Sequence, residues 1–351
     1  MNNQQTNDPR SEASVGSSTT SNLSSASINS DALKKLNHGR MVGNVSMIVS
    51  KTFSGLNENA LKYLLPRWMN ASTGVVLRLV FGSAFFWILG WCRPNKEIKV
   101  TWRDRGLLLL TGIITVFGYM YTLLMGLTYT TPISSSIFIG LQAACIYVIC
   151  LIIRTDRFSW GRFIGILLGI GGALVCVLTQ KQSDVASNPM LGNFYCFLST
   201  VLYSAYMVIE KKFLKRLDNA TVSKYTFSGG AITALIVVLA SGKWFAPVLT
   251  SDIFGVPFLV LAFVLIFPTS LSYLLTDIGL KNLPATVVGL YSNWILIVAA
   301  ICSYILGQDH FSWWQIFSIA LIIASVYFVE KAESTDHRKR IADSASIHSG
   351  K

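Results

Sequence analysis

The feature that most constrains this chain is a series of apolar stretches, each long enough to cross a lipid bilayer. Hydrophobic residues make up 52% of its 351 residues and charged residues only 13%, well below the roughly 25% that is usual in soluble domains. A window of about 19 residues predicts ten spans, at 41–58, 72–92, 106–128, 132–153, 160–179, 190–212, 223–242, 255–280, 284–306 and 312–330. We therefore expect an all-α membrane protein with ten transmembrane helices.

Most of the 29 Lys and Arg residues fall on one side of these predicted helices. When the loops between predicted helices are assigned to alternating sides of the membrane, the Lys- and Arg-rich side also carries both termini. The positive-inside rule makes this side cytosolic. Residues 1–40 hold no apolar run typical of a signal peptide, and we place the protein in the plasma (inner) membrane rather than in an organelle membrane. The net charge of +12 then reflects orientation in the lipid bilayer, and we expect no nucleic-acid partner.

A five-residue phrase occurs twice in the chain, as "DRFSW" at Asp156–Trp160 and as "DHFSW" at Asp309–Trp313. Five predicted helices separate the copies, so the two lie on opposite faces of the membrane. Each copy follows a helix that opens with proline, Pro132 in the first half and Pro284 in the second. A five-helix unit that is duplicated and inverted is typical of secondary transporters, which bind substrate near the midplane between the repeats.

The residues that carry this pattern resemble the drug/metabolite transporter superfamily, in particular its EamA-like branch of ten-helix permeases. They are Arg78 in "VVLRLVFGSAFF", the proline-led helices that end near Asp156 and Asp309, and the glycine-rich "RFIGILLGIGGALV". The resemblance covers about 41–330. It implies alternating access and transport of small metabolites without ATP.

The predicted organisation has four parts. Two EamA-like five-helix repeats, 39–180 and 188–331, form the membrane core. The serine-rich segment 1–38 and the segment 332–351 are predicted to be disordered cytosolic tails, because they offer too little apolar surface to offset the entropy of ordering.

Lys51 is the first candidate for substrate binding, because a charge inside a bilayer is costly and is a functional candidate by default. Asn44 lies seven residues earlier and Ser54 three residues later, on the same face of a predicted helix. That face is expected to look into a cavity. The alternative is a lysine that reaches the membrane interface or a backbone carbonyl.

Arg78 is the second candidate, flanked on its helix face by Gly74 and Gly82, which allow another helix to approach. Its guanidinium can bind a substrate, or it can hold carbonyls or a carboxylate in a structural role. Polar side chains near midspan in the two proline-led helices complete the predicted substrate site, although each can equally bond to a neighbouring helix. They are Gln142 in the first repeat and Tyr291, Asn293 and Trp294 in the second.

Two carboxylates, Glu210 and Asp277, fall inside predicted spans near cytosolic ends, beside Lys211 and Lys281. We interpret them as ion pairs at the membrane interface. Glu58, at the very end of its span, is not assigned to the site. We therefore expect a uniporter or exchanger rather than a proton-coupled carrier.

The ladder of Gly161, Gly165 and Gly169 permits close helix contact. We favour packing within the chain over a homodimer. Pro268, inside the predicted span 255–280, should break or kink its helix, because proline removes a backbone hydrogen bond.

Taken together, these features predict a secondary transporter of a small-molecule substrate, most simply an amino-acid-like metabolite. A sugar-phosphate or nucleotide-sugar exchanger and a non-transporting scaffold or sensor are the alternatives. The four histidines lie outside the apolar spans, and the sequence holds neither a Gly-x-x-x-x-Gly-Lys loop nor a Gly-x-Ser-x-Gly elbow. We therefore expect no enzyme activity, no metal and no cofactor.

Overall fold

The computed structural model describes residues 38–92, 100–155, 158–179, 186–308, 312–321, 323–325, 327–328 and 331. All regular structure within these residues is helical. Asp156, Asp309 and almost all of both predicted tails lie outside the described residues. The first helix spans 38–64 and the final helix begins at 313.

The elements between these two helices follow in chain order. They are α2 (Ala71–Cys92), α3 (Trp102–Thr111), the π-helical turn η1 (Gly112–Val116), α4 (Phe117–Tyr129), α5 (Pro132–Gly140), α6 (Gln142–Ile152), α7 (Trp160–Thr179), α8 (Pro189–Leu214), α9 (Asn219–Ser241), the short 3-10 helix η2 (Pro247–Thr250), α10 (Val256–Val264), the π-helical segment η3 (Leu265–Leu271), α11 (Ser272–Asn282), α12 (Ala285–Leu290) and α13 (Ser292–Ile305).

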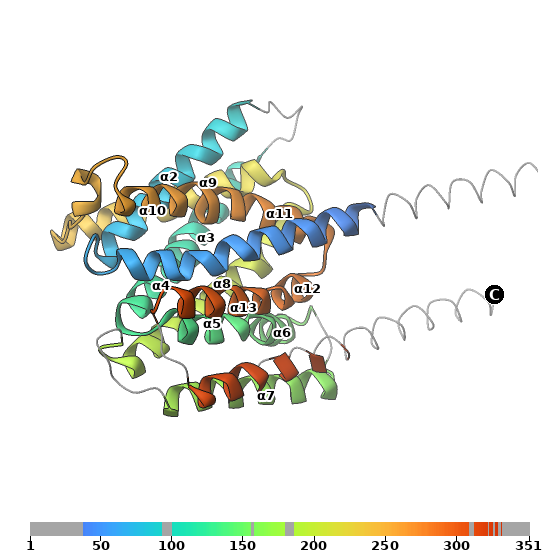
Figure 1. Ribbon diagram of the computed structural model, residues 1–351. Helices are drawn as coiled ribbons and strands as arrows, with labels where there is room; N and C mark the ends of the chain where they lie inside the picture. Colours follow the sequence, from blue (N-terminus) through green and yellow to red (C-terminus); the bar gives the residue numbers. More distant parts are fainter. Residues whose placement is uncertain are drawn as a thin grey trace, which may run out of the picture.

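Within the described residues, seven helical segments are long and apolar enough to cross a membrane. They are Ala71–Cys92, Trp102–Tyr129, Pro132–Ile152, Pro189–Leu214, Asn219–Ser241, Val256–Asn282 and Val287–Ile305. The chain is thus an integral, multi-pass membrane protein. The segments run roughly along one axis, and the first helix starts at the end of the bundle at which the final helix finishes (Figure 1).

The first helix crosses the middle of the bundle (Figure 1) and is longer at both ends than its predicted span of 41–58. It packs closely on α11 and α13. A Cβ added to Gly279 would meet Met47, and a Cβ added to Gly55 would meet Val298. The added residues place Glu58 inside the helix, with six helical residues beyond it.

Four membrane-length segments are interrupted, and in Trp102–Tyr129 the interruption is the π-helical turn η1. The segment of α10 and α11 is broken by η3, which contains Pro268, as expected for a proline that cannot donate a backbone hydrogen bond. The two proline-led segments are interrupted as well, at Leu141 between α5 and α6 and at Tyr291 between α12 and α13. The last two breaks lie next to each other in the bundle, because the Ser292 hydroxyl donates a hydrogen bond to Gln142 Oε1.

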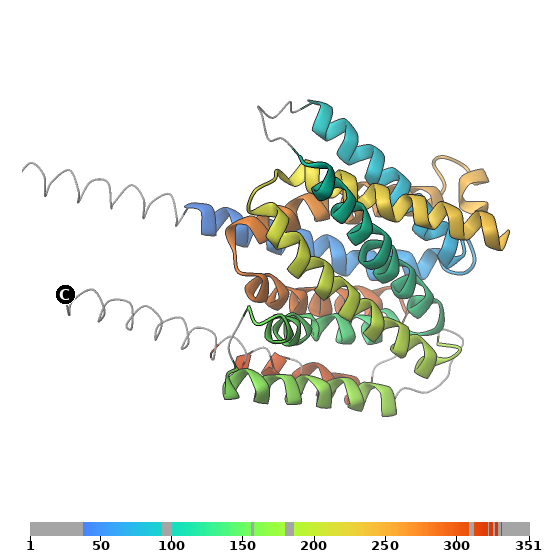
Figure 2. The ribbon, with the colours of Figure 1, turned by 180° about the vertical axis from the view of Figure 1, so that it is seen from behind.

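The tightest helix contact lies where α3 and η1 meet α9, and glycines make it (Figure 2). A Cβ on Gly112 would lie 1.9 Å from the carbonyl oxygen of Thr226, and a Cβ on Gly229 would lie 2.2 Å from that of Leu109. Backbone therefore packs directly on backbone. On the other side of α9, the ring of Phe227 fills the space beside Gly82 of α2.

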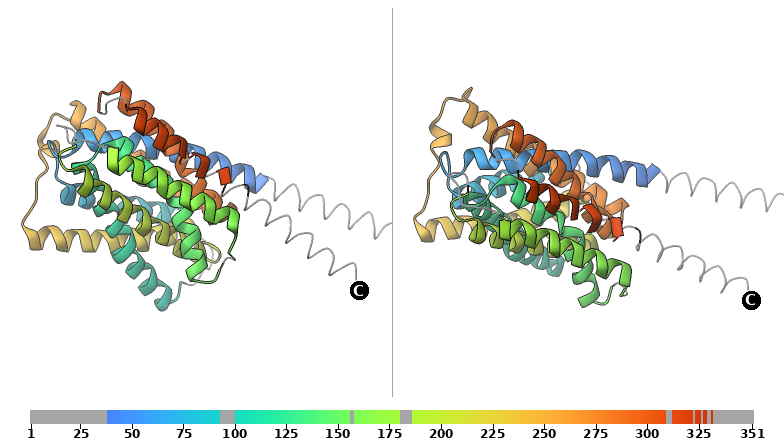
Figure 3. Two further views of the ribbon diagram at one scale, coloured as in Figure 1. Left: turned by 90° about the horizontal axis from the view of Figure 1, so that it is seen from below. Right: turned by 60° about the horizontal axis from the view of Figure 1, so that its bottom comes forward.

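The helix α7 and the final helix lie side by side at one edge of the bundle (Figure 3). The Ser318 hydroxyl donates to the Gly172 carbonyl at 2.6 Å, and a Cβ on Gly169 would meet Ser325 and Leu141. At Gly169, the glycine ladder thus packs within the chain.

Candidate functional site

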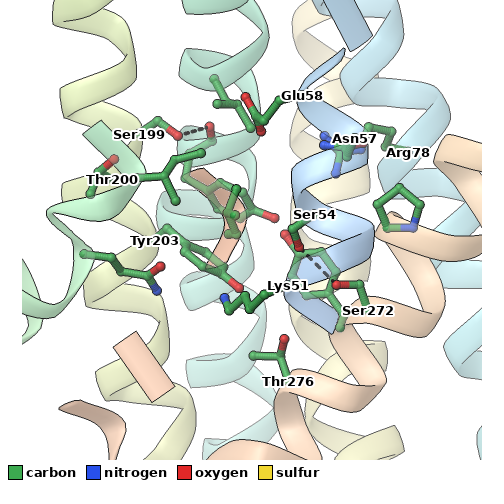
Figure 4. A pocket seen from close by; sticks show the side chains of 17 residues that line it. Lys51, Ser54, Asn57, Glu58, Arg78, Ser199, Thr200, Tyr203, Ser272 and Thr276 are labelled. Carbon is green, nitrogen blue, oxygen red and sulfur yellow. Dashed lines mark hydrogen bonds between the residues drawn. The ribbon is translucent and has the colours of Figure 1, made fainter. Parts of the chain in front are cut away.

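A polar cavity of about 70 Å3 lies in the centre of the bundle (Figure 4). The first helix supplies one side of it, and α2, α4, α8, η3 and α11 supply most of the rest. It is lined by Lys51, Ser54, Asn57, Glu58, Arg78, Tyr119, Leu123, Ile139, Gln142, Ser199, Thr200, Tyr203, Pro268, Ser272, Tyr273, Thr276 and Ile295. Both halves of the chain contribute to it.

Lys51 projects from the first helix into this cavity and is only 1% exposed. Its Nζ lies 5.5 Å from the centre of the Tyr203 ring, a cation–π contact. Within the described residues, Nζ forms no hydrogen bond or ion pair. Because burial of an uncompensated ammonium is unfavourable, the group is suited to an anionic ligand.

Arg78 enters the cavity from α2, and its Nε donates to the Thr269 hydroxyl at 2.9 Å. That hydroxyl belongs to η3, directly after Pro268. The Nη1 atom of Arg78 is buried and has no hydrogen-bond partner in the described part of the chain. The guanidinium is therefore held in place through one nitrogen, while a second remains available to a ligand.

Glu58 places a carboxylate in the same cavity, two helical turns beyond Lys51, and is 2% exposed. It accepts a hydrogen bond from the Ser135 hydroxyl at 2.8 Å. The Oδ1 atom of its neighbour Asn57 is buried without a donor among the described residues. A rise of about 1.5 Å per residue separates Glu58 from Lys51 by roughly 10 Å along the axis, so the two charges face the cavity without pairing.

Aromatic and hydroxyl groups form the remaining polar wall. The rings of Tyr119 and Tyr203 lie 4.8 Å apart, and the Tyr119 hydroxyl is buried without a partner in the described residues. In another part of the wall, the hydroxyls of Ser54 and Ser272 form a hydrogen bond of 3.2 Å (Figure 4). Four further lining residues, Asn57, Tyr273, Ser199 and Thr200, carry no signal in the sequence that marks them as part of a site.

The structure brings together three of the seven residues predicted to bind substrate, namely Lys51, Arg78 and Gln142. Gln142 is buried, and its amide contacts Met207 and Ser292. The other four predicted residues do not line the cavity. Asn44 is half-buried on the first helix, Tyr291 and Asn293 are half-buried around the break, and Trp294 is exposed and donates to the Thr52 hydroxyl at 2.8 Å.

The predicted ion pairs of Glu210 and Asp277 with Lys211 and Lys281 are wrong. Both carboxyls are fully buried, whereas Lys211 donates to the backbone carbonyls of Leu280 and Leu283 and Lys281 is exposed. The acids lie side by side on α8 and α11, away from the lysines predicted to pair with them.

The cavity presents groups of both signs of charge in one enclosed space. It offers two cations and one carboxylate, and no salt bridge joins them among the described residues. No group of three or more His, Cys, Asp or Glu suited to a metal ion occurs among the described residues. The chemistry that this site supports is therefore recognition of a charged organic solute by complementary charges and hydrogen bonds.

Comparison with known proteins agrees with this picture of a membrane carrier. The model of the EamA-like transporter family matches twice, at residues 41–178 and 190–330. The uncharacterized transporter YyaM of Bacillus subtilis is 27% identical over 276 residues, which cover 78% of this chain and 88% of that protein. An uncharacterized transporter of Methanothermobacter thermautotrophicus is 22% identical, with coverage of 83% and 86%.

A WAT1-related protein of Arabidopsis thaliana is 22% identical over 80% of this chain and 78% of its own length. A protein of known crystal structure superposes with a TM-score of 0.60 and 17% identity, and the match covers 85% of this chain and 99% of that chain. This last likeness shows a shared fold alone.

Proposed function

Because the chain belongs to the EamA-like transporter family, we propose that it is a secondary transporter of a small zwitterionic, amino-acid-like metabolite. The observation that carries this proposal is the presence of both signs of charge in one buried cavity, with Lys51 and Arg78 as cations and Glu58 as the anion. A cavity built only for anions would not place a carboxylate beside the ligand.

Each charged group of such a substrate has a matching partner in the cavity. The substrate carboxylate binds Lys51 Nζ and the free Nη1 of Arg78, which lack partners among the described residues. The substrate ammonium binds Glu58 and the free Oδ1 of Asn57. Binding thereby gives hydrogen bonds to polar atoms that are otherwise buried without them. This removes a large part of the free-energy cost of burying these atoms.

We further propose that the membrane core consists of ten helices in two inverted repeats, 39–180 and 188–331, which alternate access to the cavity. Two separate family matches, to 41–178 and 190–330, support this division. The breaks at Leu141 and Tyr291 in the two proline-led segments support it as well, since broken helices surround the substrate in many transporters. Both termini lie in the cytosol of a plasma-membrane protein in this proposal.

An anionic substrate, as in a sugar-phosphate exchanger, is the alternative. The excess of two cations over one carboxylate in the cavity favours it. The two proposals differ in the role of Glu58, which attracts the ammonium of a zwitterion and repels an anion.

The test is ligand-dependent thermal stability of the purified protein against zwitterionic amino acids, sugar phosphates and neutral sugars. A ligand at about 100 times its Kd stabilises the protein by roughly 2.7 kcal/mol if it binds only the folded state. We expect stabilisation by one or more amino acids that is lost in both Lys51→Met and Glu58→Gln.

The matched control is Asp252→Asn, which removes an exposed carboxylate in the loop between η2 and α10 and should leave ligand binding unchanged. Stabilisation by a sugar phosphate that survives Glu58→Gln and is lost in Lys51→Met would establish the anionic alternative instead. A ligand response that neither substitution alters would place the binding site outside this cavity.

A further inference from the structure

The carboxyl groups of Glu210 on α8 and Asp277 on α11 meet in the interior of the bundle. Glu210 is 1% exposed and Asp277 is 0% exposed, and the two carboxyls lie within hydrogen-bonding reach of each other. Tyr206 donates its hydroxyl to Glu210 Oε1, and Ser223 donates to Asp277 Oδ2 at 2.5 Å. These donors occupy one oxygen of each acid.

The second oxygen of each acid has no donor. Within the described residues, Glu210 Oε2 and Asp277 Oδ1 are buried without a hydrogen-bond partner. Lysine does not compensate the charge, because Lys211 is bound to the carbonyls of Leu280 and Leu283. Two adjacent carboxylates that lack a cation cannot both remain ionised in a dry interior.

The titratable groups around the pair do not remove this difficulty. The titratable residues with an electrostatic interaction with the acids are Tyr203, Tyr206 and Tyr273, and Arg78 interacts with two of these tyrosines. The helices that carry the acids, or that contact α8 or α11, also hold Lys211, Lys281, Tyr119, Lys51, Glu58, Tyr147, Cys145, Cys150, Lys224 and Tyr225. Lys51 contacts the Tyr203 ring and Lys224 contacts Trp87 and Tyr225. Neither lysine forms an ion pair with the acids in the described part of the chain.

A single proton shared by the two acids removes this unfavourable charge. Bound to one carboxyl, it supplies the O–H that donates to the other, and the pair then carries one negative charge instead of two. When the proton leaves to water, both carboxylates are charged and need solvent, which an opened gap between α8 and α11 admits. The protonated pair thus belongs to the closed arrangement and the doubly ionised pair to an open one.

The pair is also connected to the substrate cavity. Thr276 precedes Asp277 in the chain and lines the cavity. The ring of Tyr203, another lining residue, stacks on that of Tyr206 at 6.0 Å, and Tyr206 holds Glu210. A movement of α8 against α11 therefore changes the cavity wall and the acid pair together.

We propose that Glu210 and Asp277 form a proton-binding site that takes up and releases one proton in each transport cycle. This inference rests on the proposed transport function, and it replaces the expectation of a uniporter or exchanger without proton coupling.

The first test measures the bound proton and does not depend on a substrate. Infrared spectra of the purified protein in lipid at neutral pH should contain the C=O stretch of a protonated carboxylic acid. This band should lose intensity in the double variant Glu210→Gln/Asp277→Asn, in a Glu58→Gln background as well as in the wild-type background, and keep its intensity in Asp252→Asn. A missing band in the wild type, or a band of unchanged intensity after the double substitution, would overturn the proposal. If the double variant does not elute as a folded protein, the single variant Asp277→Asn is used instead. The proposal then requires the carboxyl band of this variant to titrate at a pH different from that of the wild type.

The second test measures coupling in proteoliposomes with a radiolabelled mixture of the twenty amino acids. At equal pH inside and outside, wild type and double variant should exchange label at similar rates. A gradient of one pH unit can drive about tenfold accumulation at one proton per substrate, since 1.4 kcal/mol is tenfold, and only the wild type should show it. Exchange without gradient-driven accumulation in the wild type, or accumulation retained in the double variant, would overturn coupling. Absence of all exchange in the wild type would instead reject the amino-acid substrate, and the infrared result would then decide the proton site alone.

Discussion

The contact between α3–η1 and α9 and the polar cavity beside it show two opposite ways of joining helices within one bundle. At the contact, Gly112 and Gly229 let backbone meet backbone, and an added methyl group has no room. At the cavity, the cations Lys51 and Arg78 line an internal space and form no salt bridge with the carboxylate of Glu58 among the described residues. The first surface is suited to a fixed contact, whereas the second is suited to a ligand and to movement.

The largest expected effect comes from breaking the fixed contact with Gly112→Ala. The new Cβ would lie 1.9 Å from the Thr226 carbonyl oxygen, so two backbones must separate, and we expect a loss of about 3 kcal/mol of unfolding free energy. The control Gly106→Ala adds a methyl group with nothing within 4 Å and should stabilise α3 by about 0.5–1 kcal/mol. Thermal unfolding in detergent measures both, and equal stability of the two variants would contradict a rigid contact.

The next largest effect concerns the cavity and separates binding from folding. Lys51→Met keeps an unbranched side chain but removes a buried ammonium without an ion partner in the described residues. The ligand-free protein should therefore be at least as stable as the wild type, while the roughly 2.7 kcal/mol of stabilisation by saturating ligand disappears. Melting temperatures with and without the amino acids that stabilise the wild type give both values. A variant that is strongly destabilised without ligand would assign Lys51 to the fixed part of the bundle.

A smaller effect is expected at the support of Arg78. Thr269→Val removes the hydroxyl that accepts from Arg78 Nε at 2.9 Å, and the loss of a hydrogen bond to a charged group costs about 2 kcal/mol. The matched control is Thr233→Val. Among the described residues, the Thr233 hydroxyl bonds only to the Gly229 carbonyl of its own helix α9, so this variant should change stability by less than about 0.5 kcal/mol. Unfolding curves of equal midpoint for the two variants would show that the η3 segment does not hold the guanidinium.

The smallest effect should follow a substitution outside the cavity. Trp294→Phe removes an exposed hydrogen bond to Thr52 and should alter stability by less than about 0.5 kcal/mol. Ligand-dependent stabilisation should also be unchanged, because Trp294 does not line the cavity. A loss of ligand-dependent stabilisation in this variant would show that the binding site also includes residues beyond the break at Tyr291.

The sequence predicted those cavity residues whose chemistry conflicts with an apolar surrounding. Lys51, Arg78 and Gln142 stand out because a charge or amide within an apolar span needs a reason. Pro268 likewise predicted the interruption at η3, because its missing N–H is a local property of the chain.

The residues that the sequence did not assign to the site depend on helix ends and breaks. Glu58 was placed at the end of a predicted span, whereas the first helix continues to residue 64 and puts it in the interior. Hydropathy cannot locate that end, because the continuation is stabilised by packing against the rest of the bundle rather than by lipid. The helix is interrupted at Tyr291, and Asn293 and Trp294, which follow this break, are not among the residues that line the cavity.

Glu210 and Asp277 illustrate a different limit. Each acid is followed in the chain by a lysine, at position 211 or four residues later at position 281, and this proximity suggested ion pairs. The structure instead bonds Lys211 to carbonyls and joins the acids across two helices. Which partner a buried side chain meets depends on helix packing between distant segments, and sequence neighbours do not determine it.

The central claim is that the cavity between Lys51 and Glu58 is the transport site for a zwitterion. The most direct measurement is counterflow in proteoliposomes that are preloaded with unlabelled amino acids and supplied outside with a radiolabelled mixture. We predict uptake of label by the wild type and by Asp252→Asn, and uptake at the level of empty vesicles for both Lys51→Met and Glu58→Gln. Uptake that is absent in the wild type, or that is retained by both cavity variants, would contradict the account.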